Sequence, residues 1–261
     1  MRFLLTKILF QKRALIMWWF IGMIALSIIM MYFFPFFKNS NMAASLSSLP
    51  SSVQKLIGDQ GSWSTISGYI TEQIFALRAP LLISVLSIFI FTALITGDEK
   101  KGLTETQLSL SNGRTWILIN KFLAGTLIVS IALAGTFLGI LAGLLLVHSN
   151  YSAVKILILT VNCLILCLDL GLVSLLFGCL FGSNGLAVAV ASLYAFSSYL
   201  VSSMVDSVSS LRIVDKFSLF HYYTNASTFD LRNLIVLISF GVVCLVVGLI
   251  GFNYRDIKTN S

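Results

Sequence analysis

Long apolar runs separated by short polar segments dominate the chain. A bilayer core about 30 Å thick is crossed by a helix of roughly 20 apolar residues. Asp169 is the one acidic residue inside such a run. The pattern predicts an all-α, polytopic integral membrane protein with six transmembrane helices. The runs cover 14–37, 79–97, 116–147, 155–181, 186–205 and 233–254.

The run 14–37 follows a basic segment, as the apolar core of a secretory signal peptide does. Signal-peptide cores are only about 7–15 residues long, and this run is longer. We therefore expect it to be a retained transmembrane helix.

Composition excludes soluble and disordered chains. The 261 residues are 57% hydrophobic and 10% charged, whereas soluble domains have about 25% charged residues and disordered chains have low hydrophobicity. The net charge of +7 does not indicate nucleic-acid binding, because the basic residues cluster at the ends of the spans. The cysteines lie inside apolar runs, as small buried hydrophobes do; they are Cys163, Cys167, Cys179 and Cys244.

The positions of Lys and Arg predict the orientation, because cytoplasmic loops carry an excess of basic residues. With the N-terminus inside, ten Lys and Arg fall on the cytoplasmic side and seven on the outer side. We therefore expect a multi-pass protein of the cell (inner, cytoplasmic) membrane with both termini in the cytoplasm.

The segments outside the spans differ in character. Residues 1–12 alternate apolar and basic side chains, which predicts an interfacial helix lying flat on the inner surface; a cytoplasmic extension of the first span is the alternative. The Ser-rich segment 38–78 is the expected outer loop. The segment 206–232, between the fifth and sixth spans, mixes apolar and polar residues.

The segment 98–114 reads DEKKGLTETQLSLSNGR, with dense charge at its start and leucines interleaved further on. It connects the second and third spans on the cytoplasmic side. A short amphipathic segment at such a place suits the docking of another protein; a solvated hairpin loop is the alternative. Trp116 and Lys121 follow at the level where interfacial anchors belong.

This segment resembles the connection between the second and third helices of ABC-2 type (type V) permeases, the membrane subunits of a class of ATP-binding-cassette exporters. That connection has an acidic residue, a Gly-Thr pair, a Leu-rich stretch, a Pro-x-Ser-Arg run and a later Lys. Leu103 stands where the family has Thr, and Ser111 stands where it has Pro. The matching positions are Glu99, Gly102, Glu105, Leu108, Arg114 and Lys121.

The end of the chain is similar to the same family. Residues 218–223 read SLFHYY, close to the Ser-Pro-Phe-x-Tyr-Tyr signature before the last helix, and residues 252–257 read FNYRDI, like the family's aromatic-x-Arg-Asp-Leu exit. The resemblance implies a single transmembrane domain over 1–261. In it, 98–114 would be a coupling helix and 206–232 would form short re-entrant helices.

The resemblance also implies a function: the membrane permease subunit of an exporter that moves an amphiphilic substrate, such as a peptide, a drug or antibiotic, or a lipid, out of the cell. The subunit would form a homodimer or a heterodimer with a second permease. A separately encoded ATP-binding-cassette ATPase would dock on the coupling residues Glu99, Gly102, Glu105, Leu108 and Arg114.

The sequence lacks common nucleotide-binding and catalytic motifs. No Walker A run occurs, so ATP and Mg²⁺ would be bound by the partner ATPase and no cofactor by this chain. His-Glu-x-x-His and Gly-x-Ser-Gly runs are absent as well. We therefore expect a transporter subunit with no metal site and no enzyme activity of its own.

Asp169 is a candidate for a role inside the membrane, because an acid there is costly and marks a functional site by default. Asn162 lies seven positions earlier and shares its helical face. The pair would serve in translocation or gating, by contacting substrate or a basic partner. The alternative is a protonated or hydrogen-bonded structural acid at a helix interface.

Gly135, Gly139 and Gly143 form a small-residue seam on the third span, which favours close helix packing. The seam would serve packing within the chain or dimerisation.

Other classes of membrane protein remain as alternatives. A channel or secondary transporter that works without an ATPase should carry paired intramembrane charges, whereas the apolar runs here hold only Asp169 as an acid. A non-transporting immunity or sensor protein would keep the fold and need no ATPase.

Overall fold

The computed structural model describes residues 2–39, 65–97, 113–205, 208–223 and 230–254. Within these ranges every regular element is a helix. The elements are α1 (Arg2–Gln11), α2 (Arg13–Asn39), α5 (Ile66–Tyr69), η2 (Ile70–Arg78), α6 (Ala79–Thr92), η3 (Ala93–Gly97), α9 (Arg114–Leu146), α10 (Ala153–Phe181), α11 (Asn184–Met204), η4 (Ser209–Leu211), α12 (Arg212–Asp215), α13 (Leu219–Tyr222) and α14 (Leu231–Tyr254).

Six helical stretches are long and apolar enough to cross a membrane. This confirms the predicted all-α polytopic membrane protein with six spans. The stretches are Arg13–Phe36, Ile66–Gly97, Arg114–Leu146, Ala153–Phe181, Asn184–Met204 and Leu231–Tyr254.

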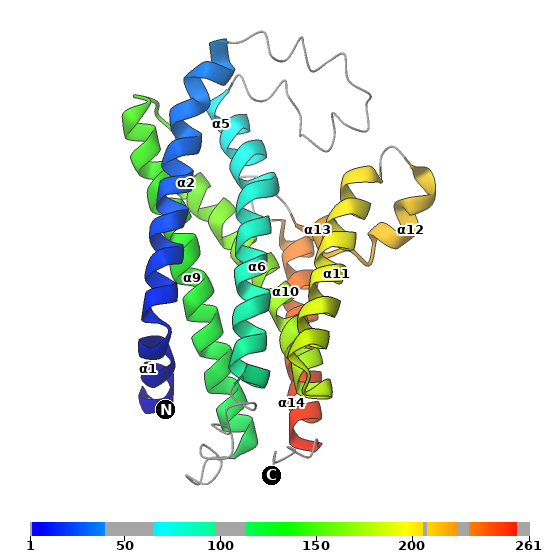
Figure 1. The fold of residues 1–261 in the computed structure, drawn as a ribbon. Helices are drawn as coiled ribbons and strands as arrows, with labels where there is room; N and C mark the ends of the chain where they lie inside the picture. Colours follow the sequence, from blue (N-terminus) through cyan, green and yellow to red (C-terminus); the bar gives the residue numbers. More distant parts are fainter. Residues whose placement is uncertain (1, 40–64, 98–112, 206–207, 224–229, 255–261) are drawn as a thin grey trace.

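The spans form a bundle with three helices inside and three outside (Figure 1). More than half of the most apolar window is buried in the spans that contain α6, α9 and α10, against less than a quarter in α2, α11 and α14. Helix α2 packs on α9, α14 packs on α10, and α11 packs on both α10 and α6. Helix α1 and the last turn of α14 lie at one end of the bundle (Figure 1); we call it the termini end, and the opposite end the distal end.

The second span begins well before the apolar run 79–97. Helix α5, η2 and α6 follow one another without a break from Ile66, so the later part of the expected outer loop is helical. The charge of Arg78 is accommodated because its guanidinium donates to the backbone oxygen of Gln73 at 2.5 Å and to the side-chain oxygen of the same residue. Both η2 and η3 are π-helical, a looser turn that is frequent at functional sites.

Short helices also occupy the described part of the segment 206–232. Helix α12 follows α11 at the edge of the bundle, and α13 lies deeper, packed against α11 and α14 (Figure 1). Helix α14 begins at Leu231. Helix α1 packs against α9 at the termini end and buries Leu4 and Ile8.

The small-residue seam on α9 faces α2 of the same chain. A Cβ at Gly135 would stand 2.6 Å from the carbonyl oxygen of Phe20, and a Cβ at Gly139 would stand 2.7 Å from that of Ile24. These distances leave no room for a methyl group, so the two backbones touch along the seam. The glycine seam therefore serves packing within the chain.

We expect Gly139→Ala to lower the free energy of unfolding by about 1–3 kcal/mol, because the added methyl group forces α2 away from α9. Gly22→Ala on α2 is the matched control, since a Cβ there meets nothing within 4 Å and helix propensity favours Ala. Thermal unfolding in detergent measures both. Equal midpoints for the two variants would contradict tight packing at the seam.

Candidate functional site

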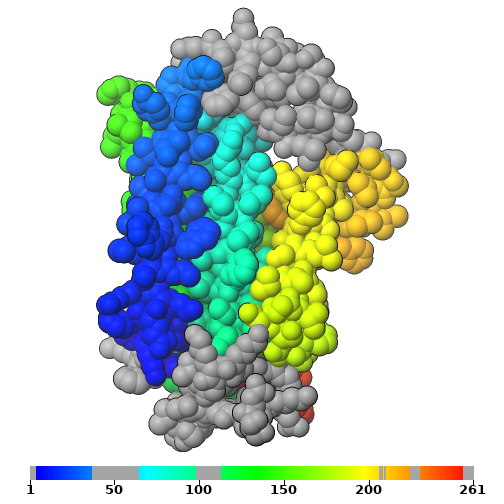
Figure 2. Space-filling view, viewed as in Figure 1, coloured from blue at the N-terminus to red at the C-terminus, as the bar shows by residue number. Residues whose placement is uncertain are grey.

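An apolar cavity of about 240 Å³ lies between the second and fifth spans. Figure 2 shows the surface hollowed between α6 and α11. Aromatic rings line one wall and aliphatic side chains the other, and the polar atoms of the lining side chains are hydroxyls. Such a lining suits an apolar molecule with few polar groups. The residues are Leu77, Leu81, Ser84, Val85, Ile88, Ser192, Ala195, Phe196, Tyr199 and Phe220.

Hydrogen bonds to α11 hold the segment that supplies Phe220. The hydroxyls of Ser198 and Ser218 lie 2.7 Å apart, and Ser218 donates to the carbonyl oxygen of Ser198 at 2.9 Å. Tyr194 donates its hydroxyl to the carbonyl oxygen of Phe217 at 2.9 Å. The Phe220 ring is thereby placed edge-on to the ring of Tyr199, with centroids 5.4 Å apart.

Tyr223 ties the same segment to the second span. Its hydroxyl donates to the carbonyl oxygen of Phe75, in η2, at 2.7 Å. Burial raises the pKa of the Tyr223 phenol well above its usual value, so the phenol stays protonated and remains a donor. The wall formed by α13 is therefore fixed to both helices that border the apolar cavity.

A histidine–carboxylate pair lies next to this wall. Nδ1 of His221 and Oδ2 of Asp215 are 2.5 Å apart; the Asp215 side chain is buried, whereas that of His221 is partly exposed. Sequence reasoning missed the pair, because its members lie on two separate short helices, α12 and α13, whose relative placement no periodicity predicts.

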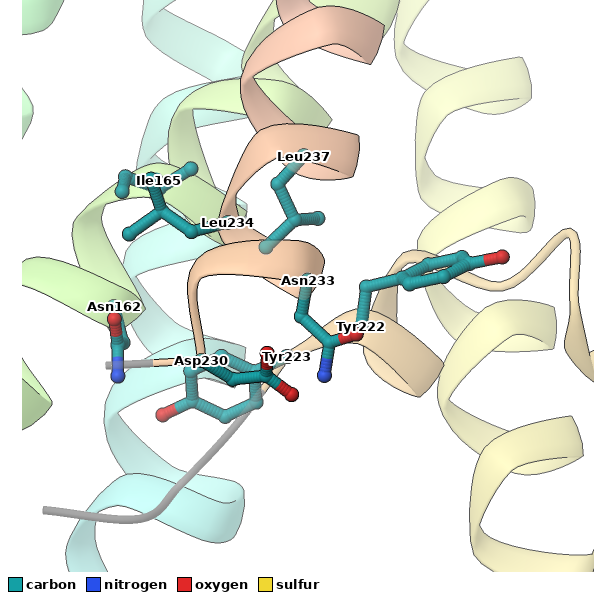
Figure 3. A pocket seen from close by; sticks show the side chains of 8 residues that line it. All are labelled: Asn162, Ile165, Tyr222, Tyr223, Asp230, Asn233, Leu234 and Leu237. Carbon is teal, nitrogen blue, oxygen red and sulfur yellow. The ribbon is translucent and has the colours of Figure 1, made fainter. Parts of the chain in front are cut away.

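A second, much smaller cavity lies between α10, α13 and α14 (Figure 3). Its volume of about 10 Å³ is enough for roughly one water molecule. Polar side chains make up much of its lining, and the apolar members come from α10 and α14. The residues are Asn162, Ile165, Tyr222, Tyr223, Asp230, Asn233, Leu234 and Leu237.

Asn162 and Asp169 both face α14, as their shared helical face predicts. Asn162 lines the small polar cavity. Asp169 lies deeper, is only 3% exposed, and has no hydrogen-bond partner for Oδ2 within the described ranges. Neither residue lines the apolar cavity between α6 and α11, so the two features are separate sites.

Among the expected coupling residues, Glu99, Gly102, Glu105 and Leu108 lie outside the described residues. Arg114 is the first residue of α9 and donates to the carbonyl oxygens of Asn253, at 3.1 Å, and Phe252, at 3.4 Å. These carbonyls belong to the last turn of α14, where a cation is favoured by the helix dipole. Arg114 therefore joins the start of the third span to the end of the sixth.

Lys121 is placed differently from the expected interfacial anchor. Its side chain is 1% exposed and lies within the bundle. The interface position was inferred from sequence distance to the helix start, which does not specify which side of α9 faces the protein.

A comparison with protein families finds a match over residues 8–253 to the model described as "Multidrug efflux system permease Rv1217c, C-terminal domain". The match begins inside α1 and ends one residue before the end of α14. No curated protein and no solved structure matches the chain.

We expect Tyr223→Phe to lower the free energy of unfolding by about 0.5–1.5 kcal/mol, since the buried carbonyl of Phe75 loses its donor. Tyr222→Phe is the matched control: its hydroxyl donates to the carbonyl oxygen of Lys216 in an exposed position, where water can replace it. Thermal unfolding of both variants tests the difference, and an equal loss in the two would show that Tyr223 does not fasten the wall.

Proposed function

The chain belongs to the family of the C-terminal domain of the multidrug efflux system permease Rv1217c, and from this premise we propose that it is the membrane permease subunit of an ATP-binding-cassette exporter of amphiphilic compounds. The observation that carries the proposal is the apolar, partly aromatic cavity between α6 and α11. Peptides, drugs and lipids share the apolar surface that such a cavity accepts.

The size of the cavity supports a working unit of two permeases. Drug-sized ligands occupy pockets of about 300–1,000 Å³, and the cavity of one chain has about 240 Å³. Phe196 lines the cavity and is nevertheless 62% exposed. A second copy, or a second permease, packed against this side would enlarge and close the site.

ATP would be hydrolysed by a separate ATPase that also binds the Mg²⁺. The ATPase would dock at the termini end, on the coupling segment 98–114, which leads directly into α9. Arg114 links the start of α9 to the last turn of α14. A push on the coupling segment would therefore reach two spans of the bundle at once.

In this proposal the protein lies in the inner membrane of the cell, with its termini end in the cytoplasm. The excess of Lys and Arg on that side supports the orientation. Substrate would enter the cavity from the membrane or the cytoplasm and leave at the distal end.

We expect Ala195→Trp to fill the cavity and to weaken binding of a fluorescent amphiphilic dye to the purified chain at least about tenfold, which equals about 1.4 kcal/mol. Leu193→Trp is the control, because Leu193 lies on the same helix, is 70% exposed and does not line the cavity. Dye titration by fluorescence measures both. Unchanged affinity in Ala195→Trp, with a normal melting curve, would rule out the cavity as the substrate site.

We expect Glu99→Ala and Glu105→Ala to weaken co-purification with the ATPase encoded nearest to this chain. Asp59→Ala removes an acid from the expected outer loop instead and should leave the complex intact. If the wild-type chain captures no ATPase, the exporter assignment falls; if all three variants behave alike, the coupling segment lies elsewhere.

A further inference from the structure

Asp169 is the carboxylate that the proposed function leaves unused. It lies near the middle of α10 and is 3% exposed. Its Oδ1 faces the backbone of α14 so closely that a Cβ at Gly241 would stand 2.5 Å away, and Oδ2 has no hydrogen-bond partner within the described ranges. An ionised carboxylate in such surroundings is strongly disfavoured, so this packing requires a positive charge or a proton on Asp169.

The groups facing Asp169 do not supply a positive charge. Tyr194 approaches from α11, Cys244 from α14, and Cys167 from the same helix. All three are neutral as protonated side chains and become negative when they ionise. Among the described residues no basic side chain forms an ion pair with Asp169. A proton is therefore the species that makes the observed packing possible.

A small cavity with polar lining lies on the distal side of Asp169. Ile165 on α10 and Leu237 on α14, each one turn away from the Asp169–Gly241 contact, border the small polar cavity. Beyond them, Asn162 and Asn233 line the cavity, and the side chain of Asp230 is exposed (Figure 3). Two apolar side chains thus separate the buried carboxyl group from a cavity that holds about one water molecule.

The same interface is closed toward the termini end. Leu175 is fully buried, and a Cβ at Gly248 would stand 3.1 Å from its Cδ2. One turn further, a Cβ at Gly251 would stand 2.6 Å from Cδ2 of Leu180. These contacts bring leucine side chains against glycine, whereas the distal side of Asp169 holds the polar cavity, so the approach to Asp169 is one-sided.

We propose that Asp169 is a proton-binding site that exchanges with the aqueous phase at the distal end through the cavity lined by Asn162, Asn233 and Asp230. On release, the O–H bond of the carboxyl group breaks, the proton passes to a water molecule in the cavity, and a carboxylate remains. The carboxylate needs water, so α14 has to move away from α10 at Gly241. The packed arrangement binds the proton more tightly than the opened one, and acid at the distal end stabilises it.

Modification by N,N′-dicyclohexylcarbodiimide, a lipophilic reagent that adds to protonated carboxyl groups, tests the proposal. The full chain is placed in membrane vesicles, and accessibility of a C-terminal tag to added protease reports which phase is distal. The pH of each phase is varied separately, and peptide mass spectrometry quantifies the adduct on Asp169. Labelling should fall by up to about tenfold per unit rise in distal pH, as the protonated fraction of Asp169 does. It should not change with the pH at the termini end.

Substitutions distinguish the proton-binding residue from the polar cavity through which the proton exchanges. Asp169→Asn should lose the adduct. Asn233→Leu, and in a second variant Asn162→Leu, should keep the adduct and lose most of its response to a jump in distal pH, because the polar cavity is filled. Asp215→Asn is the control: it removes another buried acid, which does not line the polar cavity, and should leave labelling of Asp169 unchanged.

Labelling that follows the pH of the termini-end phase, labelling that responds to neither phase, or an absent adduct would each overturn the proposal. The measurement needs neither ATPase nor substrate. If Asp169 is labelled as expected and the chain captures no ATPase, the proton site stands and the exporter assignment falls. If the chain captures the ATPase and the labelling differs from expectation, the exporter assignment stands and the proton site falls.

Discussion

In hydrocarbon the helices of this protein gain little from covering apolar side chains, because lipid tails are as apolar as leucine. Close contact between backbones has to hold the bundle instead. The seam of Gly135, Gly139 and Gly143 brings α9 against α2. The ring of Phe91 lies between Gly125 on α9 and Gly171 on α10. The packing of α2, α6, α9 and α10 therefore depends on positions that carry no side chain.

Polar contacts then set the finer arrangement at the distal side of the bundle. A hydrogen bond is stronger where it is buried, so a single buried or half-buried hydroxyl can fix a short element in one place. Ser218 and Tyr223 act in this way on α13, which has too few residues to be stable alone. The apolar cavity keeps the wall formed by Phe220 of α13 through these bonds. Its chemistry is apolar, whereas its shape is determined by hydrogen bonds.

The sequence was sufficient to predict the spans, because their signal is a long run of one kind of residue. It also placed Asn162 and Asp169 on one face of a helix, which periodicity alone determines. It did not reveal the start of the second span, since the local pattern does not show that Gln73 accepts hydrogen bonds from the charged Arg78 side chain. The apolar cavity was also missed: its members come from helices far apart in the chain, and nothing in the local pattern distinguishes Ala195, which lines it, from lipid-facing Leu193.

The glycine contacts determine which positions of this chain are free to change. Lipid-facing positions such as Leu193 and Ile235, 70% and 63% exposed, accept almost any apolar side chain. At Gly135 and Gly139 even one added carbon collides with a backbone oxygen. The amino-acid sequences of related chains can therefore diverge over most of their length while the fold stays the same. What such chains have to keep is the spacing of the glycines along the helix, more than the identity of the other residues.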